Sequence, residues 1–262
     1  MEKIVVITGA SSGIGKELAD LFKKQNAQVF SLARSFSGES EFEIKCDVTS
    51  EESVKSAFAK IKATAGKIDL LINNAGYGVY GATELISLDE AKRQFDVNFF
   101  GVLSCIQSAL PQLGRGSRIV NISSCCAIFP LPFRTLYCAS KSAVSSLGFG
   151  MRMELANAGI DVTTICPGDI KTTFTKNRVK VFESNEKYGD SIKLASEFME
   201  SKNEKRIDVA SACKKIAKIC NKQKTKTMYI IGKKYKVLNF FSKILPINFM
   251  QNCTNKMFNK KK

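Results

Sequence analysis

The stretch that decides the fold is Ile4-Val5-Val6-Ile7-Thr8-Gly9-Ala10-Ser11-Ser12-Gly13-Ile14-Gly15. Its first four residues are apolar and β-branched, which predicts a short buried strand. Leu18, Leu21 and Phe22 then recur at helical spacing, so the glycines lie between a strand and a helix. Glycine allows a tight turn and lets the backbone approach a pyrophosphate, which the free N–H groups of the helix start can bind. The context favours a dinucleotide site over a plain loop, although the spacing is Gly-x-x-x-Gly-x-Gly.

Strands and helices alternate along the rest of the chain. Short apolar segments predict strands over residues 29–33, 42–46, 68–72, 118–122, 161–166 and 227–231. Helical spacing predicts helices over residues 50–63 and 88–110, and another long helix that Tyr137 opens. This alternation is typical of an α/β fold with a Rossmann-like, doubly wound parallel sheet that carries helices on both faces. We expect a single domain over residues 1–232 and a basic amphipathic extension over residues 233–262.

The composition indicates a globular cytoplasmic protein. Hydrophobic residues make up 44% of the 262 residues, and no apolar run is long enough for a signal segment or a membrane span. The nine cysteines are scattered, with no Cys-x-x-Cys pair, which fits small buried side chains in a reducing compartment. The chain has no histidine and no metal-type spacing, so no metal site is predicted.

Positive charge is concentrated at the carboxyl-terminal end. Residues 201–262 hold 17 Lys+Arg and two acidic residues, whereas the other 200 residues carry a net charge of only +1. This end also carries an apolar stripe at helical spacing: Val237, Phe240, Phe241, Ile244, Leu245, Phe249, Met250, Cys253 and Met257. Such a segment can lie on an anionic membrane surface, pack on the body of the protein or pair two subunits. Aromatic platforms with interleaved cations are not evident, so we expect no nucleic acid as a partner.

Tyr137 and Lys141 are four residues apart, which places them on one face of a helix. Because the chain has no histidine, acid–base chemistry must come from other groups. A free tyrosine titrates near about 10, too high for efficient proton transfer at neutral pH. A neighbouring ammonium favours the phenolate and lowers the pKa. The pair therefore predicts a proton donor, or else an ordinary solvated helix face.

Three polar positions have two interpretations each. Arg34 and Ser35 end the second strand, where most NAD-binding folds place an acid, so the arginine either pairs with the 2′-phosphate of NADP(H) or is merely solvated. Asp47 follows the third strand and either meets the adenine amino group or caps the next helix. Asn98 is unfavourable in the middle of a helix, which makes it either functional or a backbone-bonding kink.

Taken together, these motifs resemble the short-chain dehydrogenase/reductase family. The resemblance runs from Ile4 to about Thr173, and six motifs match in order: residues 8–15, residues 73–76, Asn98, Ser124, Tyr137 with Lys141, and Pro167-Gly168. The serine is chosen because the family commonly places it 13 residues before the tyrosine, with Ser123 as the alternative. A Leu-Pro-Phe segment before Tyr137 is similar to the branch with 17β-hydroxysteroid and retinol dehydrogenases.

The resemblance implies a catalytic set of Asn98, Ser124, Tyr137 and Lys141. Tyr137 would protonate a carbonyl oxygen as hydride arrives from the nicotinamide, or deprotonate an alcohol in reverse. Lys141 would lower the tyrosine pKa and hold the nicotinamide ribose. Ser124 would bind the substrate oxygen together with Tyr137, and Asn98 would keep a water in line for a proton relay.

The resemblance also implies the cofactor contacts. The residues expected to border NADP(H), besides Tyr137 and Lys141, are Gly9, Ser11, Ser12, Gly13, Ile14, Gly15, Arg34, Ser35, Asp47, Val48, Asn74, Ala75, Gly76, Pro167, Gly168, Ile170 and Thr172.

The expected class of substrate is based on apolar residues in two segments, one just before Tyr137 and one after the motif Pro167-Gly168. Residues 173–201 are expected to form a mobile lid with Phe174, Val179, Val181, Phe182 and Phe198, and Phe129, Leu131 and Phe133 precede Tyr137. They would suit a lipophilic carbonyl or alcohol of steroid, retinoid or acyl-chain type, or serve only as core. The alternatives to an NADP-dependent enzyme are a non-catalytic NADPH sensor and a membrane-peripheral binding or scaffold protein. A homo-oligomer, dimer or tetramer, is expected by analogy with the family.

Overall fold

The computed structural model describes residues 2–37, 40–175, 177–201 and 206–258. Its centre is a seven-stranded sheet in the order β11-β7-β6-β4-β1-β2-β3, and every neighbouring pair is parallel. The strands are β1 (Ile4–Thr8), β2 (Gln28–Ala33), β3 (Glu43–Lys45), β4 (Ile68–Asn73), β6 (Leu113–Ile122), β7 (Asp161–Pro167) and β11 (Met228–Ile231). The predicted parallel α/β sheet is thus confirmed.

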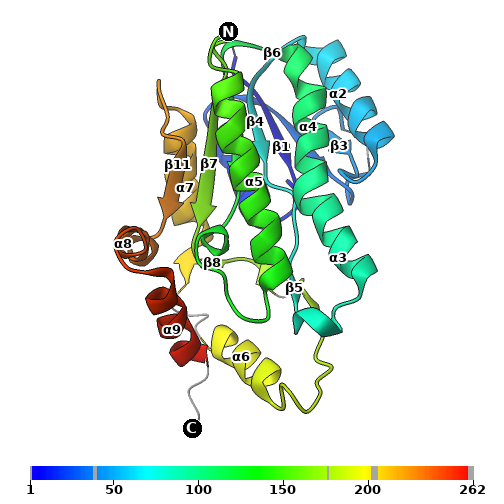
Figure 1. The fold of residues 1–262 in the computed structure, drawn as a ribbon. Coiled ribbons are helices and arrows are strands. Elements are labelled where there is room, and N and C mark those ends of the chain that lie inside the picture. The colour runs from blue at the N-terminus through cyan, green and yellow to red at the C-terminus, as the bar shows by residue number, and fades with distance from the viewer. Residues whose placement is uncertain (1, 38–39, 176, 202–205, 259–262) are drawn as a thin grey trace.

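Helices cover both faces of this sheet (Figure 1). The helices of the body are α1 (Gly13–Lys23), α2 (Glu51–Ala65), α3 (Leu88–Phe95), α4 (Gly101–Ala109), α5 (Thr135–Glu154) and α7 (Val209–Cys220). Buried side chains of α2, α4 and α5 pack on one face in one core cluster. Those of α1 and α7 pack on the other face in a second cluster. Both faces are buried, which is why the strands are continuous apolar runs.

The long helix expected over residues 88–110 is interrupted in the middle. A π-helical turn, η2 (Asp96–Phe100), separates α3 from α4, and a 3₁₀ turn, η3 (Leu110–Gln112), follows. Asn98 lies in the π turn and is fully buried. Its side chain forms hydrogen bonds with the backbone of Tyr77, so the helix is interrupted at a backbone-bonding asparagine, as one of the two interpretations predicted. Single π turns of this kind are frequent at functional sites.

Short elements fill the region beyond the carboxyl ends of the strands. They are β5 (Val79–Tyr80), η1 (Thr83–Leu85), η4 (Cys125–Ala127), β8 (Ile170–Lys171), η5 (Thr173–Thr175), β9 (Val179–Lys180), α6 (Ser191–Glu200) and β10 (Ile207–Asp208). The lid expected over residues 173–201 corresponds to η5, β9 and α6, with residue 176 outside the described part. It is tied to the body because β9 pairs in parallel with β5.

The carboxyl-terminal extension forms two helices, α8 (Lys233–Phe241) and α9 (Ile247–Phe258), on either side of Pro246. The apolar stripe that begins at Val237 is thus divided between two helices, and residues 259–262 lie outside the described part. Figure 1 shows α9 beside α6, at the end of the sheet to which β7 and β11 point. Phe258 and Phe198 make an edge contact with ring centres 5.4 Å apart. The extension thus packs on the body over the lid.

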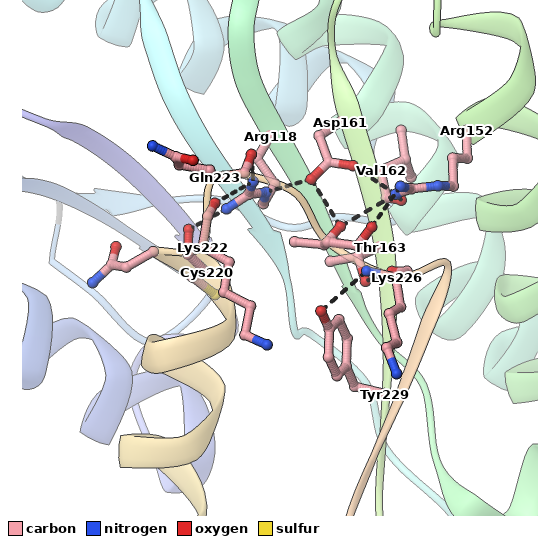
Figure 2. A network of polar contacts seen from close by, with 12 residues as sticks. Arg118, Arg152, Asp161, Val162, Thr163, Cys220, Lys222, Gln223, Lys226 and Tyr229 are labelled. Carbon is pink, nitrogen blue, oxygen red and sulfur yellow. Dashed lines mark hydrogen bonds and ion pairs between the residues drawn. The ribbon is translucent and has the colours of Figure 1, made fainter.

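A polar network holds the opposite end of the sheet together (Figure 2). Asp161, at the start of β7, forms ion pairs of 2.8 Å with Arg118 and 2.6 Å with Arg152. Thr225 donates a 2.8 Å hydrogen bond to the same carboxylate. Burial disfavours the Asp161 anion, but these hydrogen bonds and charges outweigh it and lower the pKa of the carboxyl. The two arginines also donate to backbone carbonyls of residues 220–225, which fixes the loop between α7 and β11.

Replacing Asp161 with Asn should therefore destabilise the protein. Two largely buried guanidinium groups would lose their counter-ion, at a cost of about 2–3 kcal/mol, which is less than the roughly 3–5 kcal/mol of a fully buried pair because the carboxylate is partly exposed. Urea denaturation would measure the loss. Lys55→Gln, which breaks the exposed Lys55–Glu51 pair on α2, is the matched control and should change stability by less than about 0.5 kcal/mol. An unchanged midpoint for Asp161→Asn would contradict this role of the network.

Candidate active site

A cavity of about 1270 Å³ opens at the carboxyl ends of the central strands. Its walls come from the loops that follow β1, β2, β4, β6 and β7, together with the lid and the carboxyl-terminal helices. The strand order reverses between β1 and β4, and ligands of such sheets bind beside this point. The fold therefore places this cavity where a dinucleotide is expected.

The glycine-rich turn between β1 and α1 is held close to the end of β4. Asn74 Nδ2 donates to the carbonyl oxygens of Thr8 (3.0 Å) and Gly9 (3.1 Å), and Thr8 Oγ1 accepts from the amides of Asn74 and Ala75 at 3.0 Å each. Gly9 has a φ of 65°, and a Cβ atom there would lie 2.8 Å from Ala75 Cα. A Cβ on Gly15 would lie 2.3 Å from the Gly9 oxygen. Close contact therefore requires glycine at both positions, and the positive φ of Gly9 favours glycine there as well.

The amino terminus of α1 faces the cavity without competing groups of its own. Ser12 is the N-cap residue, its side chain makes no cap hydrogen bond, and no acidic residue lies in the first turn. Backbone N–H groups at such a terminus bind phosphate. Across the turn, Thr172 Cβ would be 3.6 Å from a Cβ on Gly13. The chain thus offers a narrow polar channel suited to a pyrophosphate.

The adenosine end of the cavity is lined by Arg34, Ser35, Asp47 and Val48. Arg34 is exposed and forms no ion pair with an acid in the described part of the chain. The Asp47 carboxylate accepts from the amide and hydroxyl of Thr49, which is a local turn, whereas Ser50 caps α2. The alternative that Asp47 caps α2 is therefore wrong, because the N-cap residue is Ser50.

Ser124, Tyr137 and Lys141 meet at the centre of the cavity, where η4 and the first turns of α5 come together. All three are buried, and the Ser124 hydroxyl partly offsets the burial that raises the pKa of Tyr137. Ser123, the alternative serine, instead donates to the Lys141 carbonyl at 2.8 Å and contacts Ser145. Its hydroxyl is engaged within the fold, which favours Ser124 as the substrate contact.

The electrostatics of Tyr137 differ from the expectation. Burial and, to a smaller extent, the neighbouring Cys126 raise the pKa of Tyr137 to about 12. The cations that oppose this rise most are Arg134 and Arg178, not Lys141. The expected lowering of the phenol pKa by Lys141 is therefore not what the geometry gives, because desolvation dominates.

Lys141 is itself shaped by burial. Its ammonium donates to the carbonyl oxygen of Ile122 at 2.9 Å, and burial lowers its pKa to about 8. A desolvated amine with a raised tendency to lose its proton is suited to proton exchange near neutral pH.

Asn98 and Gly76 lie directly behind this pair. Asn98 Oδ1 accepts from the Tyr77 amide at 3.0 Å, and Nδ2 donates to the Tyr77 carbonyl at 2.9 Å and to Ser140 Oγ at 3.0 Å. A Cβ on Gly76 would lie 2.9 Å from Asn98 Oδ1 and 3.3 Å from Lys141 Nζ. Only glycine therefore lets the cavity floor approach both groups.

The structure gathers almost all of the predicted site residues in one place. The cavity is lined by Gly9, Ser11, Ser12, Gly13, Ile14, Arg34, Ser35, Asp47, Val48, Asn74, Ala75, Gly76, Ser124, Tyr137, Lys141, Pro167, Gly168, Ile170 and Thr172. Gly15 and Asn98 lie outside this lining: the first packs under the glycine turn and the second behind Gly76. Within the described residues, no cluster of Cys, Asp or Glu could hold a metal ion.

Several lining residues were missed by the sequence reasoning. They include Tyr77, Arg134, Arg178, Arg206 and Tyr235, and the side chains of Leu238, Met250, Cys253, Thr254 and Phe258 from the extension. Arg134 could have been found, since it lies one helical turn before Tyr137. The others are brought in by tertiary packing: Tyr235 rests against Gly168, where a Cβ would be 2.2 Å from its ring, and its hydroxyl donates to Asp169 at 2.5 Å.

The chain belongs to the short-chain dehydrogenase/reductase family: residues 3–181 match the family model for short chain dehydrogenase. The protein is therefore an oxidoreductase with a nucleotide-binding fold. The 3-ketodihydrosphingosine reductase of Bacteroides thetaiotaomicron is 34% identical over 257 residues, which cover 95% of each chain.

Among the solved structures similar to this chain, two examples carry a bound nicotinamide cofactor. The 3-ketoacyl-(acyl-carrier-protein) reductase of Brucella melitensis, in complex with NADH, is 26% identical, with a TM-score of 0.72 over 87% of this chain and 96% of its own. ElxO with NADP bound is 28% identical, with a TM-score of 0.73 over 90% of this chain and all of its own. The glycine turn, the α1 terminus and the cavity described above fit a cofactor of this type.

Proposed function

We propose that this protein is an NADP(H)-dependent oxidoreductase that interconverts a carbonyl and a secondary or primary alcohol on a lipophilic substrate. The observation that carries the proposal is the position of Tyr137. Its side chain lines the same cavity as the glycine-rich turn, while 95% of the residue surface is buried. A phenol with a raised pKa holds its proton at neutral pH and can donate a hydrogen bond to a carbonyl oxygen.

The residues around Tyr137 have separate tasks in this proposal. When bound, the nicotinamide supplies or accepts the hydride. Tyr137 gives its proton to the carbonyl oxygen in reduction and takes it back in oxidation. Ser124 donates a hydrogen bond to the same oxygen as negative charge develops there. Lys141 holds the nicotinamide ribose, and Asn98 fixes the loop behind it. Both N–H groups of the Asn98 amide already donate, to Tyr77 and to Ser140, while Oδ1 accepts one hydrogen bond from Tyr77. Oδ1 can accept a second hydrogen bond, and we propose that the water binds there.

The substrate end of the cavity is largely apolar. Its lining includes Phe129, Leu131, Phe174, Phe198, Met199, Leu238, Met250 and Phe258. They come from four separate parts of the chain, and three of them belong to the extension that covers the lid. A cavity of this kind buries an alkyl or ring system while the polar end reaches Tyr137. A similar protein is named for its reduction of 3-ketodihydrosphingosine, which agrees with a lipophilic ketone.

A cofactor sensor without catalysis is the alternative function. The complete set of Ser124, Tyr137 and Lys141 in one buried site favours the enzyme, since a sensor has no use for a buried phenol beside the cofactor.

Replacing Tyr137 with Phe separates the two. The variant keeps the ring and its packing on Phe174, whose centre lies 5.6 Å away, but lacks the proton. We expect hydride transfer to fall by at least about 100-fold while NADPH binding stays within a few-fold. NADPH absorbance during turnover and NADPH fluorescence on binding measure the two effects. Normal turnover in Tyr137→Phe would reject the assigned acid.

Arg34 underlies the preference for the phosphorylated cofactor. It stands at the end of β2 with no acid paired to it in the described ranges, so its charge is available to a 2′-phosphate. Arg34→Asp should lower kcat/KM for NADPH by about tenfold or more and raise it for NADH. The ratio of the two cofactors at saturating substrate is the measurement, with Arg115→Asp on the far end of the sheet as control. An unchanged ratio would remove Arg34 from the proposal.

We propose in addition that the extension contacts an anionic membrane surface. The side chains of Val237, Phe240, Phe241, Ile244, Ile247 and Phe249 are 46–72% exposed, while Leu238 and Met250 face the cavity. Lysines 233, 234, 236, 243 and 256 belong to the same two-helix segment. Apolar side chains among lysines suit the headgroup region of an anionic bilayer. No helix in the described part is long and apolar enough to cross a membrane.

This surface can be tested without truncation. Ile244→Glu combined with Ile247→Glu places two negative charges on the exposed face and should weaken cosedimentation with phosphatidylserine-containing vesicles at least about tenfold. Ser56→Glu with Thr64→Glu, on the exposed face of α2, is the control with the same charge change. Equal sedimentation of both double variants and wild type would eliminate the membrane contact.

We also propose a homo-oligomer. Exposed apolar side chains of Leu88, Phe100 and Met153, which are 54–74% accessible, lie on α3, η2 and α5. These are the helices that family members are expected to pair.

A further inference from the structure

Two arginine side chains from distant parts of the chain lie beside Tyr137. The guanidinium carbon of Arg134 is 4.7 Å from the centre of the Tyr137 ring. The guanidinium carbon of Arg178 is 5.7 Å from the Phe174 ring, which in turn is 5.6 Å from the Tyr137 ring. Both arginines line the cavity. Arg134 is the N-cap residue of α5, whereas Arg178 precedes β9, so the pairing of β9 with β5 carries it over the site.

These two charges are poorly compensated. Neither forms an ion pair with an aspartate or glutamate of the described ranges. Arg134 is 5% exposed, and Nε of Arg178 is buried without a hydrogen-bond partner. Burial and the charge of Arg134 lower the pKa of Arg178 to about 10. Two like charges in a partly dehydrated site repel each other, and an unpaired buried guanidinium is costly.

The nearby acids do not remove this imbalance. Asp169 acts on Arg134, but its carboxylate also accepts the hydrogen bond of Tyr235. A hydrogen bond from Cys138 lowers the pKa of Cys126, and the charge of Arg134 acts in the same direction. A thiolate there would balance one arginine and leave the other. The positive charge of the pair is therefore not balanced by the acids near it, and the cavity can accept a further anion.

We infer that the substrate is an anionic amphiphile, whose carboxylate or phosphate group is bound by Arg134 and Arg178 a few bonds from the carbonyl that is reduced. The inference rests on the proposed function and names the substrate class. Guanidinium groups bind carboxylate and phosphate with paired, charge-assisted hydrogen bonds. Beyond them, the apolar lining receives the chain, with Phe198 and Phe258 in contact where the lid meets α9.

The same geometry disfavours a cationic headgroup at this position, so the likeness to the 3-ketodihydrosphingosine reductase supports the lipophilic chain of the substrate and not an amino group. An ammonium group between two guanidinium groups would add a third positive charge, which is unfavourable in a partly buried site. The site thus discriminates by charge among ketones with equal chains.

Matched ketones test the inference on the full-length enzyme with NADPH. The first pair is 4-oxodecanoic acid and its methyl ester. The second is the phosphate monoester of 1-hydroxy-2-decanone and the free hydroxyketone. The corresponding 1-amino-2-decanone supplies the cation. We expect kcat/KM at least about tenfold higher for each anion than for its neutral partner, and lowest for the amine. Equal or better use of the neutral compounds would overturn the inference.

Arg178→Gln should reduce this charge preference, measured as the ratio of kcat/KM for each anion to that for its neutral partner, to within about threefold. Arg178→Lys retains the charge but not the paired donors, so its preference for anions should lie between those of wild type and Arg178→Gln. It replaces Arg178→Gln in the test if that variant does not fold. Arg115→Gln, which removes an exposed arginine that bonds only the Asn157 carbonyl in the described part, should leave the preference intact. A preference retained in Arg178→Gln would also overturn the assignment.

Binding without turnover separates this inference from the proposed function. If no ketone is reduced, the affinities of decyl phosphate, decanoate and decanol for the protein still report on the arginine pair. Calorimetry should show both anions binding at least about tenfold tighter than decanol, and Arg178→Gln should abolish the difference. Inorganic phosphate tests the need for the chain: competition as strong as that of decyl phosphate would reject an amphiphile.

Discussion

The hydrogen bonds between Thr8 and Asn74 are the constraint on which the site depends. They pull the end of β4 against the turn after β1, so that Gly9 meets Ala75 and Gly15 meets the Gly9 carbonyl with no room for a Cβ atom. This contact keeps the first turn of α1 open toward the cavity. It also fixes the loop that carries Gly76, against which Asn98 and Lys141 are placed. The glycine-rich turn and the residues around Lys141 are thus joined through one set of contacts.

Burial determines how this floor can act. Tyr137 and Lys141 are both removed from water, and desolvation moves their pKa values in opposite directions, to about 12 and about 8. The phenol is kept protonated and the amine is brought close to neutral pH. This arrangement favours a donor poised for a carbonyl oxygen with a proton reserve behind it. The arginines that oppose the rise in the phenol pKa come from the lid and from the start of α5, and in the proposed function they link substrate binding to the acid.

Much of this was predictable from the sequence because the signals are local. The apolar strand before the glycines, the i, i+4 spacing of Tyr137 and Lys141, and the alternation of elements each depend on neighbouring residues. The break in the helix at Asn98 was only half predictable. An asparagine in a helix indicates a local conflict, but the partner backbone of Tyr77 is 21 residues away. The prediction that Lys141 lowers the pKa of Tyr137 was wrong, because the spacing of two residues indicates that they are close but not how far they are removed from water.

The parts that escaped prediction are those that long-range packing assembles. Arg178 reaches the site through the pairing of β9 with β5, and the extension reaches it through the contact of α9 with α6. Their apolar spacing permitted a membrane surface, a packed helix or an interface, and the structure uses one part for packing while exposing another. A single amphipathic pattern thus serves two environments, which no periodicity can separate.

The most direct measurement is a crystal structure of the protein with NADP⁺ and a bound alcohol or ketone. The account predicts the pyrophosphate at the start of α1 and the substrate oxygen within about 3 Å of both Tyr137 Oη and Ser124 Oγ, on the hydride-donating side of the nicotinamide. A dinucleotide bound elsewhere, or a substrate oxygen held away from both hydroxyls, would contradict it.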